Sequence, residues 1–181
     1  MTSASPHILQ VLTGTVAPLG ATGKTSAIAK QPVAGPAAIG PLGLQGDAQA
    51  DLRVHGGPDK AVHLYAWAHY AAWRAELGDA PVLQAPGAFG ENLAVAGLDE
   101  AGVCIGDHWR AGSAVLEVTQ GRQPCWKLNL RFGVPDMSAR VQNTLRAGWY
   151  CRTLQAGVVH AGDAVTIPRQ SRGHSGCEPL K

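Results

Sequence analysis

The sequence predicts a mainly β, single-domain protein with a few helices, in which short strands close into a barrel. A length of 181 residues suits one domain. The 23 glycines and 12 prolines favour many turns. Strand-like runs recur between turn signals along most of the chain, as they do in all-β barrels. We place the domain over residues 1–168 and a polar C-terminal tail over residues 169–181, where no periodicity is found.

The first third of the chain predicts short strands separated by turns. Residues 7–14 and 16–19 indicate a first strand and turn, and residues 26–33, interrupted by Pro32, indicate a second short strand. Residues 35–46 are rich in glycine and proline but carry Ile39, Leu42 and Leu44, which favours a strand that leads into a tight loop.

One helix follows a short apolar run over residues 61–65, which suits a buried strand or the lead-in to a helix. Ala66, Tyr70, Trp73 and Leu77 fall on one face at helical spacing, and Gly78 supplies a C-terminal cap. We interpret this aromatic stripe as core packing.

The remainder of the chain predicts further strands with turns such as Gly106-Asp107 and Gly112-Ser113 between them. These strands are expected over residues 92–95, 103–105, 109–111, 114–119, 150–153 and 164–167.

Composition excludes several classes of function. The formal net charge is only +2, from 15 basic and 13 acidic residues, which is too weak to predict nucleic acid or an anionic membrane as a partner. The N-terminus lacks a signal-peptide pattern and no apolar run is long enough to span a membrane, so a cytoplasmic protein is expected. The four cysteines are scattered, unlike a disulfide scaffold or a paired zinc site.

Cys125 is the main candidate for chemistry. It follows the predicted strand 114–119, Pro124 restricts the preceding turn, and Arg122 and Lys127 are close in sequence. Nearby cations favour a thiolate, which is what a soft-metal ligand or a nucleophile requires. The alternative is a buried structural cysteine flanked by surface cations.

A second candidate segment covers residues 46–60. The Gly56-Gly57-Pro58 turn allows backbone amides to approach a ligand, and Arg53, His55 and Lys60 could converge on phosphate or another anion. A solvated loop whose acids neutralise its bases explains the same residues equally well.

Other polar residues favour structural interpretations when taken alone. Glu91 and Asn92 could orient polar parts of a cofactor or could cap a turn. His63 lies in an apolar run and is interpreted as a core histidine, and Cys104 and Cys151 are interpreted as inert core thiols.

Taken together, five segments resemble the MOSC family, and within it the YiiM-like hydroxylaminopurine-resistance branch. They read GDAQADLRVHGGPDKAV, FGENL, CIGD, RQPCWKL and GWY, in this order, and the similarity runs from about Ser26 to Pro168. The resemblance implies a MOSC-type β-barrel whose pocket binds the pyranopterin molybdenum cofactor, with Cys125 as the metal ligand. It favours the metal-ligand interpretation of Cys125 over the structural one.

The implied activity is that of an oxidoreductase that reduces N-hydroxylated bases and related compounds. Thiolate is a soft donor, so Cys125 can complete sulfur-rich coordination of molybdenum. The cofactor's phosphate and pterin would be held by Arg53, His55, Lys60, Arg122 and Lys127, with His55 also a proton donor and with Gly56, Gly57, Glu91 and Asn92 as further binding residues. The chain has no flavin or iron–sulfur motif, so a separate flavin-dependent reductase is the expected electron donor.

Two other hypotheses remain. The domain could carry the molybdenum cofactor, or a persulfide on Cys125, without turnover of its own, or it could be a regulatory barrel with an inert Cys125. A homodimer is compatible with each hypothesis. Longer YiiM-like proteins continue into a small helical C-terminal domain, whereas this chain ends in the polar tail.

Overall fold

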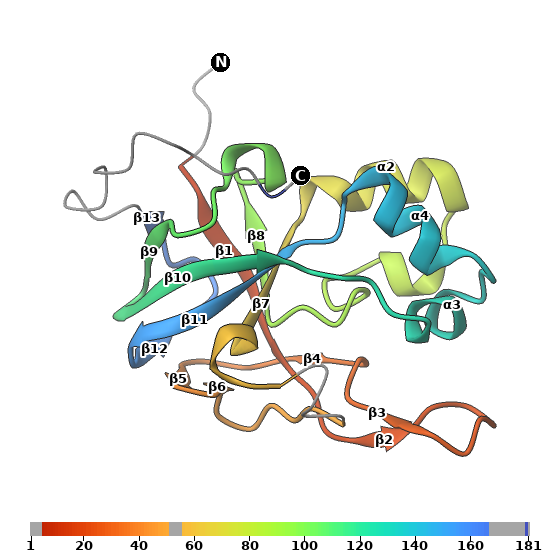
Figure 1. Ribbon diagram of the computed structural model, residues 1–181, viewed down its shortest axis with the longest axis horizontal. Coiled ribbons are helices and arrows are strands. Elements are labelled where there is room, and N and C mark those ends of the chain that lie inside the picture. Colours follow the sequence, from red (N-terminus) through yellow and green to blue (C-terminus); the bar gives the residue numbers. More distant parts are fainter. Residues whose placement is uncertain (1–4, 51–55, 167–179, 181) are drawn as a thin grey trace.

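The computed structural model describes residues 5–50, 56–166 and 180. In these residues the chain is mainly β with three α-helices, which confirms the general fold class. An eight-stranded sheet in the order β13-β9-β10-β11-β7-β8-β1-β4 dominates the fold. A three-stranded sheet, β12-β5-β6, and the two-stranded hairpin β2-β3 accompany it. Figure 1 shows the three α-helices, α2, α3 and α4, gathered on one side of the large sheet.

The structure sets the bounds of each element. The strands are β1 (His7–Thr13), β2 (Ala17–Pro18), β3 (Thr25–Ser26), β4 (Gln31–Pro32), β5 (Ala37–Gly40), β6 (Gly43–Leu44), β7 (Val62–Ala66), β8 (Leu93–Ala96), β9 (His108–Ala111), β10 (Ala114–Gly121), β11 (Trp149–Gln155), β12 (Gly157–Val159) and β13 (Val165–Thr166). The helices are η1 (Pro58–Lys60), α2 (Ala68–Leu77), η2 (Pro81–Leu83), η3 (Glu100–Gly102), α3 (Lys127–Phe132) and α4 (Met137–Thr144).

The predicted closure into a barrel is wrong. Over residues 5–50 and 56–166 the large sheet ends at β13 on one side and at β4 on the other. The beginning of β1 meets the segment before β13 through a single β-bridge, His7 to Ala164, and not through a continuous ladder. Because β13 has only two residues, it is too short to form the second ladder that closure requires.

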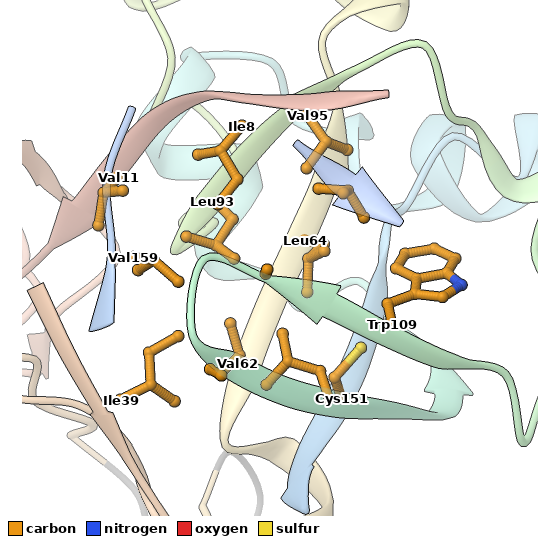
Figure 2. Packing of buried hydrophobic residues seen from close by; sticks show 14 of the residues in the cluster. Ile8, Val11, Ile39, Val62, Leu64, Leu93, Val95, Trp109, Cys151 and Val159 are labelled. Atoms are coloured by element: carbon orange, nitrogen blue, oxygen red, sulfur yellow. The ribbon is translucent and has the colours of Figure 1, made fainter. Parts of the chain in front are cut away.

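Strand β7 divides two regions of the interior. Successive side chains of a strand point to opposite faces, so Val62, Leu64 and Ala66 share one face while His63 and Tyr65 share the other. The first set packs into the main core, between strands of the large sheet and the sheet β12-β5-β6. Figure 2 shows this core, in which Cys151 lies among aliphatic side chains. The second face of β7 meets the helices.

The helix side contains a smaller aromatic core. Tyr65 stacks on Phe89 with ring centroids 4.2 Å apart, and Tyr70 and Trp73 of α2 pack against the same ring. Trp73 Nε1 donates to the Tyr65 hydroxyl, so these buried polar atoms are paired. Tyr70, Trp73 and Leu77 of the predicted stripe are therefore core packing, as the sequence predicts, whereas Ala66 lies in β7 and packs in the main core instead of on the helix.

Three local predictions differ from the structure. Helices α3 and α4 occupy a region for which no helix is predicted. Residues 103–105 do not form a strand, since Cys104 makes one β-bridge and a turn follows. Cys104 is also disulfide-bonded and only half-buried, so it is not the inert core thiol that the sequence predicts.

The remaining expectations concern the C-terminal tail and membrane-spanning segments. Nearly all of the predicted tail, residues 169–181, lies outside the described residues, of which Leu180 is the exception. None of the helices in the described part of the chain combines the length and apolar character needed to cross a bilayer.

Candidate functional site

A cavity of about 70 Å³ opens where the two sides of the fold meet. Its walls come from distant parts of the sequence. They are β3 and the chain that follows it, η1 and the segment before it, β7, the loop before β8, the segment from β10 to the start of α3, and β11. The lining residues are Ser26, Ala27, Ile28, Lys30, Ala48, Gln49, Ala50, Lys60, His63, Phe89, Gly90, Asn92, Arg122, Cys125, Lys127 and Tyr150.

The cavity is lined by cations. Lys30, Lys60, Arg122 and Lys127 line it, and no acidic side chain is among the lining residues that the structure describes, although Asp47 pairs with Lys30. In a cavity with low-dielectric walls, such positive charges attract an anion more strongly than they would in water. The cavity is therefore suited to an anionic ligand.

Cys125 contributes a free thiol to this cationic cavity. It is half-buried and lies in the turn that leads from β10 into α3, where its carbonyl accepts from Leu128 N–H. The second free cysteine in the described residues, Cys151, is fully buried in the main core, and burial raises the pKa of its thiol. The prediction of an inert core thiol at Cys151 fits this burial, and the geometry leaves Cys125 as the free sulfur that can meet a ligand.

Arg122 is positioned by the end of the large sheet. Its backbone N–H donates to Gly148 O at 3.0 Å, which continues the β10–β11 pairing past Gly121. Arg122 is 7% exposed, and its Nη1 has no hydrogen-bond partner. A buried, unpaired N–H costs about 1–3 kcal/mol, and more on a charged group. An anionic ligand would satisfy that nitrogen.

His63 and Tyr150 form one wall as a directly opposed cross-strand pair of β7 and β11. Their ring centroids are 5.2 Å apart. His63 Nε2 donates to the Ala147 carbonyl at 3.2 Å, because a carbonyl oxygen can only accept. Burial, assisted by the positive charge of Arg122, holds the pKa of His63 well below its usual value, so the ring is neutral. Burial also raises the pKa of Tyr150, which keeps its phenol protonated.

Asp47 organises the opposite wall. Its carboxylate pairs with Lys30 Nζ at 2.5 Å and accepts from Gly14 N–H and Asn92 Nδ2, both at 2.8 Å. Burial lowers the pKa of Lys30, although the Asp47 carboxylate opposes that effect. Asn92 Oδ1 also accepts from His63 N–H, so Asn92 connects Asp47 to β7.

Glu91 lies apart from the cavity. Its buried carboxylate accepts from Tyr70 Oη at 2.5 Å, from Gly87 N–H at 2.7 Å and from Phe89 N–H at 3.0 Å. These bonds fix the loop that places Phe89 and Gly90 on the cavity wall. Glu91 therefore positions this wall and does not face the ligand.

The predicted site residues are thus partly brought together. Lys60, Asn92, Arg122, Cys125 and Lys127 share the cavity, whereas Gly56, Gly57 and Glu91 are not among its lining residues. Arg53 and His55 lie outside the described residues.

Sequence reasoning missed Lys30, His63 and Tyr150 as cavity residues. The available signal was the strand alternation around His63 and Tyr150, since each has apolar neighbours on both sides in sequence and must face away from them.

Comparison with known proteins identifies the family of the chain. The MOSC domain family matches residues 51–166, which covers Lys60, the whole of β7 to β11 and Cys125. The chain belongs to the MOSC family. It is 45% identical to protein YiiM of Escherichia coli K12 over 139 residues, which are 77% of this chain and 62% of YiiM. It is 50% identical to protein YflK of Bacillus subtilis over 133 residues, 74% of this chain and 58% of YflK.

A third curated relative of this MOSC domain is a protein of Gibberella moniliformis named "Reductase", 44% identical over 79% of this chain but only 26% of that protein. The chain thus spans less than two thirds of the curated relatives that it matches. Among solved structures, YiiM of Geobacillus stearothermophilus superposes with a TM-score of 0.75 at 33% identity, covering 93% of this chain and 77% of that one. YiiM of E. coli gives a TM-score of 0.72 at 32% identity, with 91% and 70% covered.

Proposed function

We propose that this MOSC domain binds the pyranopterin molybdenum cofactor through Cys125 and reduces N-hydroxylated bases and related N-hydroxylated compounds. One observation carries the proposal: the free thiol of Cys125 shares a cavity with Lys60, Arg122 and Lys127. The family and the relative named "Reductase" support an oxidoreductase of MOSC type.

The residues present fit such a cofactor. A thiolate is a soft ligand for the metal, and the cations suit the cofactor's phosphate. The unpaired Nη1 of Arg122 supplies a buried donor that the protein itself does not use. The cavity volume of about 70 Å³ is too small for a whole pyranopterin cofactor, so part of the cofactor would lie outside the cavity.

In this proposal the chain's own groups bind and orient. Cys125 would hold the metal, and Arg122, Lys60 and Lys127 would hold anionic groups of the cofactor. His63 would stay neutral and keep Nε2–H on Ala147 O, so that it supports Tyr150 without adding a further positive charge. The phenol of Tyr150 would offer a hydrogen-bond donor to the cavity.

The proposed reaction converts R–NHOH, two electrons and two protons into R–NH₂ and water. The bound cofactor supplies the two electrons that break the N–O bond. A separate flavin-dependent reductase would return those electrons to the cofactor. The protons come from water through groups at the cavity.

The test compares wild type with Cys125→Ala, purified from a host that makes the cofactor. We expect about one molybdenum per wild-type chain and turnover of an N-hydroxylated purine with reduced methyl viologen, and loss of both in Cys125→Ala. Cys151→Ala is the matched control, because it removes a thiol that lies away from the cavity.

The outcomes separate the hypotheses. Wild-type protein without molybdenum would refute cofactor binding. Molybdenum, or sulfane sulfur on Cys125, without N–O reduction would favour the carrier function instead.

A further inference from the structure

Trp126 is an exposed aromatic side chain that the proposed function does not use. It is 42% exposed, while Trp73, Trp109 and Trp149 are at most 1% exposed. Its neighbours on both sides in sequence, Cys125 and Lys127, line the cavity. Trp126 itself precedes α3 without making a side-chain cap for that helix.

The β2–β3 hairpin brings a second wall of the cavity to this indole. Lys24 Nζ lies 4.9 Å from the centroid of the Trp126 ring, and Ser26, two residues further on, lines the cavity. The hairpin holds Lys24 in place, because Leu19 N–H donates to Lys24 O at 2.8 Å. Figure 1 shows the hairpin and α3 on the same side of the molecule.

The indole therefore contacts the segment that leads to Ser26 and directly follows Cys125, so it links two segments that each contribute to the cavity. Its π face attracts the Lys24 ammonium, as expected for a cation over an electron-rich ring. That exposed lysine side chain is long and flexible, so it can move aside for a ligand. Among the exposed large hydrophobic residues that the structure describes, Trp126 is the only aromatic one.

We propose that Trp126 is a specificity-determining residue that selects planar heteroaromatic N-hydroxylated substrates by stacking, with their N-hydroxyl group directed towards Cys125. This inference rests on the proposed function for the identity of the reacting group. Every nucleobase has a π face, so stacking selects flat rings over aliphatic chains without reading a base edge.

The first experiment measures N–O reduction by the molybdenum-loaded protein with an N-hydroxylated purine and with an aliphatic hydroxylamine. Stacking of a base on an aromatic side chain is worth on the order of tenfold in binding. Trp126→Ala should raise KM for the purine about tenfold and leave KM for the aliphatic compound unchanged, and Trp126→Phe should restore much of the difference. Leu130→Ala is the matched control, since Leu130 is 47% exposed on α3, the helix that begins directly after Trp126, and its loss should affect neither KM.

A second experiment needs no turnover. Iodide quenches exposed tryptophan, so in wild type it should act chiefly on Trp126 and, more weakly, on the half-buried Trp67. Saturating adenine, a planar base without an N–O bond, should protect the fluorescence of wild type and of Leu130→Ala but not that of Trp126→Phe.

The two measurements distinguish this inference from the proposed function. Adenine protection without N–O reduction would refute the reductase and retain the stacking site. Turnover with equal KM changes for both substrates in Trp126→Ala, or no protection by adenine in wild type, would overturn the role of Trp126.

Discussion

Replacing Gly148 with alanine should lower the free energy of unfolding for two reasons: the backbone conformation at this position and the contacts that an added Cβ would make. Gly148 has φ +75°, a conformation that costs an L-residue about 1–2 kcal/mol. An added Cβ would lie 2.2 Å from Leu64 O and 2.8 Å from His63 Nε2. Relieving that overlap requires β7 and β11 to move apart, and overpacking of this kind costs about 1–3 kcal/mol. We therefore expect a total loss of about 3 kcal/mol in the free energy of unfolding.

Gly133→Ala is the matched control. Gly133 has φ +65° and ψ +23° at the end of α3, and an added Cβ there would meet nothing within 4 Å. Only the conformational cost of about 1 kcal/mol remains.

The assay is urea unfolding followed by circular dichroism. With a slope of about 2 kcal/mol/M, the midpoint should fall by about 1.5 M for Gly148→Ala and by about 0.5 M for Gly133→Ala. Equal midpoint shifts would refute the claim that close approach of β7 to Gly148 adds to the backbone cost. A normal midpoint in both variants would refute the positive-φ argument as well.

Three further predictions concern the cavity and its support. The pKa of His63 is depressed in the folded protein, so the unfolded chain takes up this proton at higher pH than the folded protein does. The free energy of unfolding of wild type should therefore fall as pH drops below about 6.5. His63→Gln should show a shallower decline of that free energy between about pH 7 and 5 in urea titrations. Iodoacetamide at pH 8 should label Cys125 in native protein and Cys151 only after unfolding, as read by peptide mass spectrometry, and equal labelling of both native thiols would contradict the burial argument. Glu91→Gln should lower the free energy of unfolding by about 2 kcal/mol and the thermal midpoint by about 6 °C. The reason is that two loop N–H groups and the Tyr70 phenol lose a charged acceptor. An unchanged thermal midpoint would show that these hydrogen bonds do not stabilise the fold.

Some parts of the site could be predicted because their signal is local. Cys125, with Pro124 before it and Lys127 after it, can be recognised from neighbours in sequence alone. Helix α2 carries its own signal, since Tyr70 and Trp73 recur at helical spacing and then pack as expected.

Helices α3 and α4 gave no comparable signal. They are six and eight residues long, and neither is capped by a side chain at its N-terminus. Their stability comes from burying Leu128, Met137 and Val141 against the aromatic core, a contact that depends on the rest of the fold.

The amino-acid sequence by itself determined the strand-rich, turn-rich domain, the aromatic helix and the cysteine beside its cations. Only the tertiary structure decided which other side chains surround that cysteine. Alternation along β7 and β11 fixes that His63 and Tyr150 face away from the main core, but the pairing of these two strands makes them directly opposed. Lys30 reaches the same cavity because Asp47, 17 residues away, holds its ammonium group. Strand pairing and long-range ion pairs join residues that no local pattern relates, which is the physical reason why the open sheet and the full cationic cavity appear only in the folded chain.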